Sequence, residues 1–293
     1  MSASTRTRRA AAIVLALVTA AGPAVPLHAA ELRPETARAF DAYARTLEDR
    51  TRRELASGTG FLGLDFQDPS VAPATRSRII AGEVPVSRMA ERGHNAEEIE
   101  VPEGLINHWR GAIFVPGMTL DQVLTDLRSP QVRRHVQDDV LESRVLWRKG
   151  DESQLFLKLV RKKIVTVTYN TEHHVRYTRL SPTRAYSQSL STRIAEVDEA
   201  GTPNEREKPV GNDRGFMWRL HSYWRYEQVP GGVIIELESL TLSRDIPALI
   251  KFLARPLIDS IARESMTRTL ESVRARLIAG GASRADGPLA QAR

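Results

Sequence analysis

The sequence predicts an α+β fold in which a curved antiparallel sheet packs on a long C-terminal helix, with a helical extension at the N-terminus. Three observations support this prediction. Strand-like segments follow one another between residues 141 and 197. A hairpin with a Pro-Gly-Gly turn comes next, and a stripe of apolar residues at helical spacing then runs from about Pro247 to Ile278. A sheet that is apolar on one face needs a covering element, and the C-terminal helix can supply it.

Length and composition exclude several classes of protein. The chain has 293 residues, of which 41% are hydrophobic and 27% charged, so it is an ordinary globular protein with enough residues for one large domain or two modest ones. It has no cysteine. Disulfide scaffolds, thiol catalysis and thiolate metal sites are therefore excluded.

The N-terminus has the pattern of an export signal. Arg6, Arg8 and Arg9 precede an uncharged apolar run over residues 10–21, and small residues follow at Ala29 and Ala30. The run is shorter than the roughly 20 residues that a membrane-spanning helix needs. We therefore predict that residues 1–30 are a signal peptide, cut after Ala29 or Ala30, and that the protein is periplasmic or secreted. Twin-arginine export through Arg8-Arg9 and an uncleaved anchor are the alternatives.

The position of the positive charge argues against a nucleic-acid partner. Loss of residues 1–30 removes three arginines and no acidic residue, so the formal net charge falls from +6 to +3. A charge of this size, spread among acidic residues, gives no basic footprint for DNA or RNA. One basic run remains at Arg161–Lys163. It is either a solvated turn or a transient contact for an anionic membrane surface.

Residues 31–104 are interpreted as an N-terminal helical extension packed on the main domain. Phe40, Tyr43 and Leu47 recur at helical spacing and predict a helix over Pro34–Leu55. The stretch that follows contains scattered Gly and Pro. Its one recognisable element is a possible short strand at Glu83–Met89.

The main domain is predicted over residues 105–278. Gly111–Pro116 is a strand candidate, and Thr119 is a plausible N-cap for a helix over Leu120–Leu127, with a second short helical piece after Pro130. The strand candidates that follow are Leu141–Lys149, Gln154–Arg161, Lys163–Asn170, Val175–Leu180 and Arg184–Val197. The polar insertion Gly201–Gly215 is either a lid or a tolerated loop.

The hairpin permits a prediction of register. If Gln228 faces Val233, then Arg225 faces Glu236, and Trp224 and Tyr226 face Leu237 and Ile235, so that both faces carry favourable cross-strand pairs. The apolar face is expected to meet the C-terminal helix. The other face is expected to be open to solvent, with Glu236 and Glu238 in surface ion pairs with Arg225; it carries Arg219, His221, Arg225, Glu236 and Glu238.

The last helix is predicted from about Pro247 to Ile278, with Pro256 either kinking it or starting its longer second part. Its apolar stripe consists of Ile250, Leu253, Leu257, Ile261, Met266, Leu270, Val273 and Leu277. Residues 279–293 are small and polar and are predicted to be a disordered tail.

This order of elements resembles the START/Bet v 1-like (SRPBCC) superfamily, and most of all the bacterial START-like proteins of unassigned role. The resemblance spans roughly residues 105–278 and is carried by three segments: Gly111–Pro116 before the Thr119 helix, Trp218–Tyr226 (WRLHSYWRY), and Leu240–Pro247 (LTLSRDIP). It implies a helix-grip fold with a cavity between the sheet and the long helix. Members of the superfamily include lipid carriers, quinone-binding proteins and aromatase/cyclases.

The ligand-binding residues are predicted as the walls of that cavity, because apolar ligands bind among aromatic and aliphatic side chains with a few polar groups. The alternative is a filled core without a cavity. The predicted residues are Trp218, Leu220, Ser222, Trp224, Tyr226, Ile235, Leu237, Leu253 and Leu257.

No catalytic, metal or cofactor site is predicted. His173 and His174 are adjacent on a strand and point to opposite faces, and the other histidines lack ligand spacing. No Gly-x-Ser-x-Gly, phosphate-loop or Ser-x-x-Lys motif occurs.

The expected function is therefore binding, with or without transfer, of a lipid-like or other hydrophobic molecule by an exported protein. The alternatives are a cyclase/aromatase-type enzyme acting on a bound apolar substrate, and an envelope protein-interaction module that docks through residues 31–104. The sequence leaves the oligomeric state open.

Overall fold

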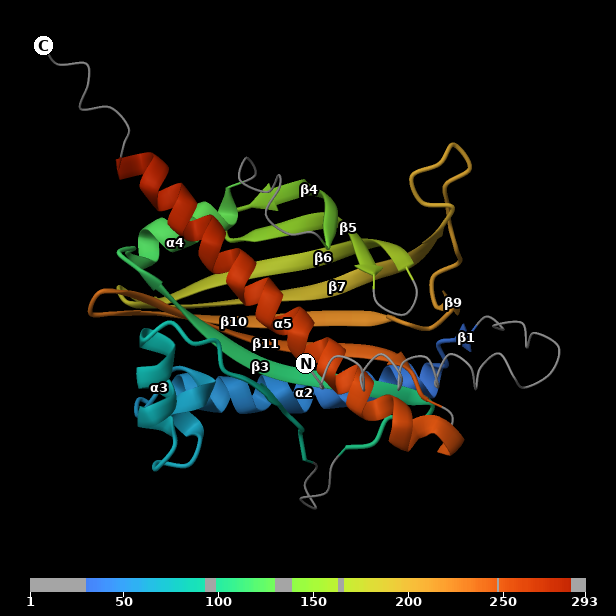
Figure 1. Ribbon diagram of the computed structural model, residues 1–293, viewed down its shortest axis with the longest axis horizontal. Coiled ribbons are helices and arrows are strands. Elements are labelled where there is room, and N and C mark those ends of the chain that lie inside the picture. The colour runs from blue at the N-terminus through green and yellow to red at the C-terminus, as the bar shows by residue number, and fades with distance from the viewer. Residues whose placement is uncertain (1–29, 93–98, 130–138, 163–165, 247, 286–293) are drawn as a thin grey trace, which may run out of the picture.

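The computed structural model describes residues 30–92, 99–129, 139–162, 166–246 and 248–285. A large antiparallel sheet forms the centre, with a long helix across one face and a second helix behind it (Figure 1). The helices are α2 (Pro34–Ala56), the 3-10 helix η1 (Gly63–Phe66), α3 (Ala72–Ile80), α4 (Leu120–Arg128) and α5 (Ala248–Ala285). The strands are β1 (Ala30–Glu31), β2 (Val86–Arg88), β3 (Gly104–Pro116), β4 (Val140–Lys149), β5 (Glu152–Lys162), β6 (Thr166–Ser181), β7 (Arg184–Asp198), β8 (Arg206–Glu207), β9 (Asn212–Asp213), β10 (Arg219–Val229) and β11 (Gly232–Arg244).

The strand order and the position of α5 confirm the predicted α+β class, in which an antiparallel sheet packs on a long C-terminal helix. The nine-stranded sheet runs β2-β3-β11-β10-β7-β6-β5-β4, with β8 paired to β7, and β1 pairs separately with β9. The predicted hairpin register is also confirmed: Gln228 pairs with Val233, Arg225 with Glu236, and Trp224 with Leu237. Cross-strand chemistry on both faces was thus sufficient to fix this pairing.

The helix after β3 begins as predicted. Thr119 is the N-cap of α4. Its hydroxyl oxygen accepts a hydrogen bond from the Gln122 N–H, and the Gln122 side-chain oxygen accepts one from the Thr119 N–H. This reciprocal capping box satisfies two backbone donors at the helix start.

One face of the sheet packs against α5. Tyr226, Ile235 and Leu237 are buried there together with the α5 residues Met266 and Leu270. The close approach of α5 to β3 requires Gly111, because a Cβ at that position would lie 2.7 Å from the Leu270 Cδ1 atom. The second half of the predicted apolar stripe, Met266, Leu270, Val273 and Leu277, therefore covers the expected face.

The opposite face is also covered, so the prediction of a sheet buried on one side only is wrong. Alternate residues of β10 and β11 point away from α5, and there Tyr223, Leu240 and Leu242 pack against Phe40 and Leu47 of α2. Phe61, Leu62 and Leu64 around η1, with Ile79 of α3, continue this cover over Ala112 and Ile234. The N-terminal extension is thus the second layer of the domain.

Several boundaries differ from those predicted. β3 begins at Gly104 rather than Gly111, and β6 is one strand where two were predicted. α3 was not predicted, and α5 continues to Ala285, beyond the predicted end at Ile278, with Pro256 inside it. The signal peptide, the helical piece after Pro130 and most of the predicted tail lie outside the described residues. No described helix combines the length and apolarity needed to cross a membrane.

Candidate functional site

The candidate site is a cavity of about 240 Å³ between α5 and the strands from β4 to β10. Strands β4 to β7 and β10 supply one wall, and α4 and α5 supply the other. Its described lining is largely aliphatic and aromatic and consists of Leu127, Val140, Ser143, Leu155, Leu157, Val175, Tyr177, Ser187, Ser189, Trp224, Tyr226, Ser272, Val273 and Arg276. Such a lining, with a few polar groups, is typical of a site for a hydrophobic small molecule.

Two aromatic side chains of β10 lie in this wall. Trp224 and Tyr226 are two residues apart on one face of the strand, and their rings are parallel, with centroids 6.5 Å apart. The Tyr226 hydroxyl is within 3.0 Å of Ser187 Oγ on β7. Burial raises the pKa of Tyr226 well above its ordinary value, so the phenol stays neutral and its O–H remains a donor.

The one cationic side chain in the described lining is Arg276 of α5. Its Nε atom is buried and has no hydrogen-bond partner, and none of the described carboxylates lies within ion-pair distance of its guanidinium. Burial lowers its pKa, while Tyr177, Tyr226 and Asp126 oppose that shift at longer range. Arginine nevertheless remains charged in proteins. A positive charge without a close partner therefore borders an apolar cavity.

The structure brings only some of the predicted site residues together. Trp224 and Tyr226 line the cavity. Ile235 and Leu237 lie on the same face but are buried under α5 in the core. Leu220 packs beside Met217 and Ile194, farther along the sheet.

Three further predicted residues lie outside the described lining. Ser222 is paired with Ser239 of β11 and Ser189 of β7, and of these only Ser189 lines the cavity. Leu257 is half-buried on α5, and the Leu253 side chain lies outside the described residues.

Trp218 requires a correction, because it does not share the face of Trp224 and Tyr226. It precedes the first residue of β10, so strand alternation does not extend to it, and its ring packs with Phe40, Tyr43 and Leu240 on the α2 side. The assignment of Trp218 to the cavity wall was therefore wrong.

Most of the cavity wall was missed by sequence reasoning. Leu155 and Leu157 on β5, Val175 and Tyr177 on β6, and Ser187 and Ser189 on β7 all line it. Each pair is two residues apart, which is the strand period, so this alternation was the available signal. Arg276 could not have been found in this way, because it lies beside the helix stripe rather than on it.

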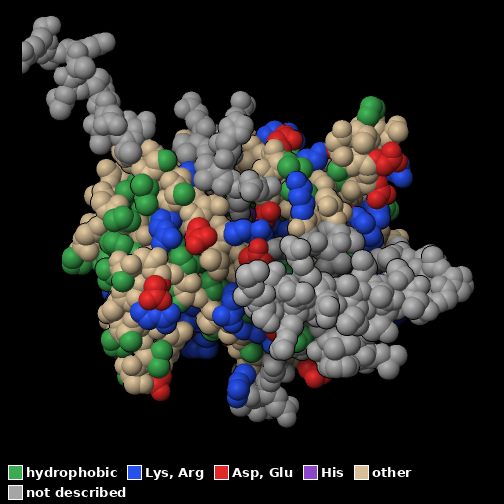
Figure 2. All heavy atoms as spheres, in the orientation of Figure 1, with side chains coloured by type: hydrophobic (Ala, Val, Ile, Leu, Met, Phe, Trp, Pro, Cys, Tyr) green, Lys and Arg blue, Asp and Glu red, His purple; other side chains and the backbone are tan. Residues whose placement is uncertain are grey.

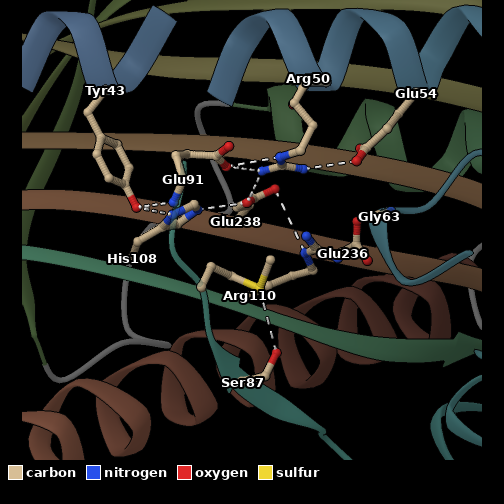
Figure 3. A network of polar contacts seen from close by, with 12 residues as sticks. Tyr43, Arg50, Glu54, Gly63, Ser87, Glu91, His108, Arg110, Glu236 and Glu238 are labelled. Atoms are coloured by element: carbon tan, nitrogen blue, oxygen red, sulfur yellow. Dashed lines mark hydrogen bonds and ion pairs between the residues drawn. The ribbon is translucent and has the colours of Figure 1, made fainter. Parts of the chain in front are cut away.

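The other face of the sheet holds a buried polar network (Figure 3). Arg50 of α2 donates from Nη2 to Glu238 Oε1 at 2.5 Å and to Glu91 Oε1 at 2.7 Å, and from Nη1 to Glu54 at 3.1 Å. His108 Nε2 lies 2.7 Å from the same Glu238 oxygen. Burial alone would raise the pKa of Glu238, but the His108 hydrogen bond and the Arg110 and Arg50 charges hold it below its usual range.

Tyr43 connects His108 to the backbone of Glu91. Its hydroxyl oxygen accepts the Glu91 N–H at 2.8 Å and lies 2.9 Å from His108 Nδ1. Because an ionised carboxylate only accepts hydrogen bonds, the His108 Nε2–H donates to Glu238.

Glu236 is held by backbone rather than by side chains alone. Its two oxygens accept the N–H groups of Gly63 and Leu64 at 2.6 and 2.9 Å. Gly63 is required, since a Cβ there would lie 2.9 Å from both Glu236 Oε1 and the Arg110 guanidinium. Burial raises the pKa of Glu236, and the Arg110 and Arg225 charges oppose the shift.

The prediction that Arg225, Glu236 and Glu238 form surface ion pairs is therefore wrong. They are 3%, 2% and 3% exposed, because α2, η1 and α3 cover the strand face that was expected to be open. Arg225 instead donates to the Phe61 carbonyl oxygen at 2.9 Å and pairs with Glu54 of α2.

Part of this network has the composition of a metal site. One ligand atom each of Glu91, His108 and Glu238 lies within 4.8 Å of the others. However, the Arg50 guanidinium donates to both carboxylates, and both ring nitrogens of His108 have partners. A cation would have to displace a resident positive charge, so these residues fit an ion-pair network and do not fit a metal.

Acid–base chemistry has few candidate groups in the cavity. Its described lining includes no histidine, aspartate or glutamate, and Arg219, His221 and Glu236 belong to the opposite face. His173 of β6 pairs with Leu155 of β5. It is buried, its Nε2 lies 3.0 Å from Thr171 Oγ1, and burial lowers its pKa to about 4.

The basic run at the end of β5 is only partly available for a partner. Arg161 pairs with Asp139 at 2.7 Å, whereas Lys162 is exposed. On the face seen in Figure 2, Lys and Arg side chains are interspersed with Asp and Glu rather than gathered in one patch.

No family model matches this sequence, and no curated protein matches it. Solved structures of similar fold include a STAR-related lipid transfer protein from Xanthomonas axonopodis, 14% identical, with a TM-score of 0.44 over 65% of this chain and 98% of that chain. Human StAR-related lipid transfer protein 5 is 15% identical, with a TM-score of 0.40 over 86% and 98%. The Zhui aromatase/cyclase from Streptomyces sp. R1128 is 12% identical, with a TM-score of 0.37 over 59% and 94%. The chain is similar to these structures in fold, as an antiparallel sheet with a long C-terminal helix across one face.

Proposed function

We propose that this protein binds a small hydrophobic molecule in the cavity under α5. The observation that carries the proposal is the cavity itself, which has a volume of about 240 Å³ and is walled by Leu155, Leu157, Val175 and Trp224. Burial of an apolar ligand there would contribute about 25 cal/mol per Å² removed from water. The few hydroxyl groups of the lining would orient it.

The size of the cavity restricts the ligand. At about 240 Å³ the cavity is slightly smaller than the roughly 300–1,000 Å³ typical of small-molecule sites. A single short chain or a single ring fits this volume, whereas a two-chain lipid would have to leave most of its length outside.

The proposal is tested with purified protein by native mass spectrometry and by titration with octanol or a fluorescent hydrophobic probe. A variant that fills the cavity from α5, Val273→Phe, should weaken binding about tenfold or more, and Trp224→Ala should weaken it by removing a wall. Trp147→Ala is the matched control, because Trp147 is 45% exposed and outside the described lining. Unchanged binding in both cavity variants would show that the ligand binds elsewhere.

Export and transfer are further parts of the proposal. The basic, apolar and small-residue order of residues 1–30 supports a cleavable signal. Cell fractionation and the intact mass of the purified protein test it, with cleavage expected after Ala29 or Ala30. A protein retained in the cytoplasm at full length would contradict it.

Transfer would require contact with a membrane, for which Lys162, the exposed last residue of β5, is the candidate cation. Lys162→Gln should weaken binding to anionic vesicles by about fivefold, which corresponds to about 1 kcal/mol for one surface cation. Equal binding of both proteins to anionic and neutral vesicles would argue against a membrane contact.

A further inference from the structure

Arg276 distinguishes this cavity from a simple apolar pocket. A buried guanidinium loses its hydration, and it normally regains partners through carboxylates or carbonyl groups. Arg276 has neither at Nε among the described residues. Three other arginines in the interior of the described structure have carboxylate partners. Arg50 has Glu91 and Glu238, Arg225 has Glu54, and Arg110, whose Nε also lacks a hydrogen bond, lies 3.8 Å from Glu238.

Arg128 provides a close internal comparison. Its guanidinium lies 5.4 Å from the centre of the Tyr177 ring, next to the cavity that Arg276 borders. It is nevertheless fully engaged: Nη1 pairs with Asp151 at 2.9 Å and Nη2 donates to the Gly150 carbonyl oxygen at 2.9 Å. Two arginines thus adjoin the same tyrosine, and one of them lacks a close anionic partner.

Neutral donors accompany Arg276 in the lining. Ser272 is one helical turn before it on α5, so both side chains lie on the same side of the helix and both line the cavity. Across the cavity, Tyr226 is held neutral and hydrogen-bonded to Ser187. A guanidinium with hydroxyl donors is the set of groups that binds a carboxylate or a phosphate group.

We propose that the cavity binds a small amphiphile with an anionic head group, whose carboxylate or phosphate pairs with the Arg276 guanidinium and whose apolar part lies along Leu155, Leu157 and Trp224. This inference rests on the proposed function and specifies its ligand class. Asp126 is a carboxylate that acts on Arg276 from α4, but at longer range than an ion pair. The anion of the ligand therefore supplies the close partner that the protein does not.

The test uses the purified protein in the form in which the cell produces it. The ligands share one chain length and are octanoate, octyl phosphate and octanol, at pH 7. The wild type should bind one of the two anions at least about tenfold more tightly than octanol. Inorganic phosphate and acetate, which lack the chain, should not bind at the same concentrations. Binding of a chainless anion as tight as that of its octyl counterpart would show a free-anion site and overturn the proposal.

Variants assign the preference to Arg276. Arg276→Gln should abolish the tenfold difference and leave octanol affinity within about twofold, and Arg276→Lys should retain part of it. Arg128→Gln is the matched control and should leave the preference unchanged. An unchanged anion-to-octanol ratio in Arg276→Gln would overturn the proposal, and if that variant does not fold, the wild-type ratio alone decides.

The outcomes distinguish a failure of the head-group proposal from a failure of the proposed function. If octanol and the fluorescent probe bind without any preference for an anion, the head-group proposal is wrong and hydrophobic binding remains. If no chain-bearing compound binds, both proposals are wrong.

Discussion

The two faces of the sheet use charge in opposite ways. On the α2 side, Arg50, His108 and Glu238 are buried together and each is bonded to the others or to a neighbour. On the α5 side, Arg276 borders a cavity without a close partner. The charges on the α2 side are paired within the protein, whereas the Arg276 guanidinium has no close carboxylate partner among the described residues. This difference supports the proposal that a ligand binds on the α5 side of the sheet.

The largest expected effect lies in the network. Glu238→Ala leaves Arg50 and His108 buried without their shared acceptor and should lower the free energy of unfolding by about 3–5 kcal/mol in urea. Asp49→Ala on the same helix removes only the exposed pair with Arg52 and should change it by less than about 0.5 kcal/mol. Similar small effects in both variants would mean that the network does not hold α2 on the sheet.

A second effect depends on pH. Burial lowers the pKa of His173 to about 4 in the folded protein, below the ordinary 6.5, so the unfolded state takes up a proton first as the pH falls. Stability is therefore lost between about pH 6.5 and pH 4, by about 2 kcal/mol from pH 7 to pH 5 for this group. Urea unfolding of His173→Gln should show a correspondingly flatter dependence, and an identical slope would contradict the assignment.

Matched hydroxyl deletions compare the faces directly. Tyr43→Phe removes the acceptor of the Glu91 N–H and the partner of His108 inside a packed network, and should cost about 2 kcal/mol of unfolding free energy. Tyr226→Phe removes a bond to Ser187 beside a cavity that can admit water, and should cost less than about 1 kcal/mol. The reverse order would mean that the cavity face is the more tightly constrained of the two.

The smallest effect has the opposite sign. Arg276→Met removes a half-buried charge that has no close partner and should raise the unfolding free energy of the unliganded protein by about 1 kcal/mol. The same change on the other face, Arg50→Met, should destabilise. A loss of stability in Arg276→Met would show that Arg276 serves the fold rather than a ligand.

The architecture was largely predictable from the sequence, because it depends on periodicity. Strand alternation, the Thr119 cap and the pairing of Trp224 with Leu237 are local properties of the chain. The cover over the second face was not predictable in the same way. Its contacts join residues that are far apart in the sequence, such as Arg50 and Glu238. Charged residues at alternate positions of a strand ordinarily indicate a face that is exposed to solvent.

The candidate site was predictable only in part, for the same reason. Trp224 and Tyr226 follow from the hairpin register, whereas the wall formed by β5, β6 and β7 depends on how far the sheet curves around α5. The face of Trp218 could not be predicted from alternation, because alternation holds only inside a strand and Trp218 precedes β10. The position of Arg276 depends on the rotation of α5 about its axis, which the apolar stripe alone does not determine.

The network of α2 also has a consequence for the order in which the chain is made. Arg50 and Glu238 are 188 residues apart, so α2 leaves the ribosome long before β11 exists. At about 5–20 residues per second, the wait lasts roughly 10 to 40 seconds. During that time α2 has no sheet to cover, and the charges that later lie in the interior keep this helix hydrated. The charged residues that bind α2 to the sheet in the folded protein thus also keep this helix hydrated until β11 has been made.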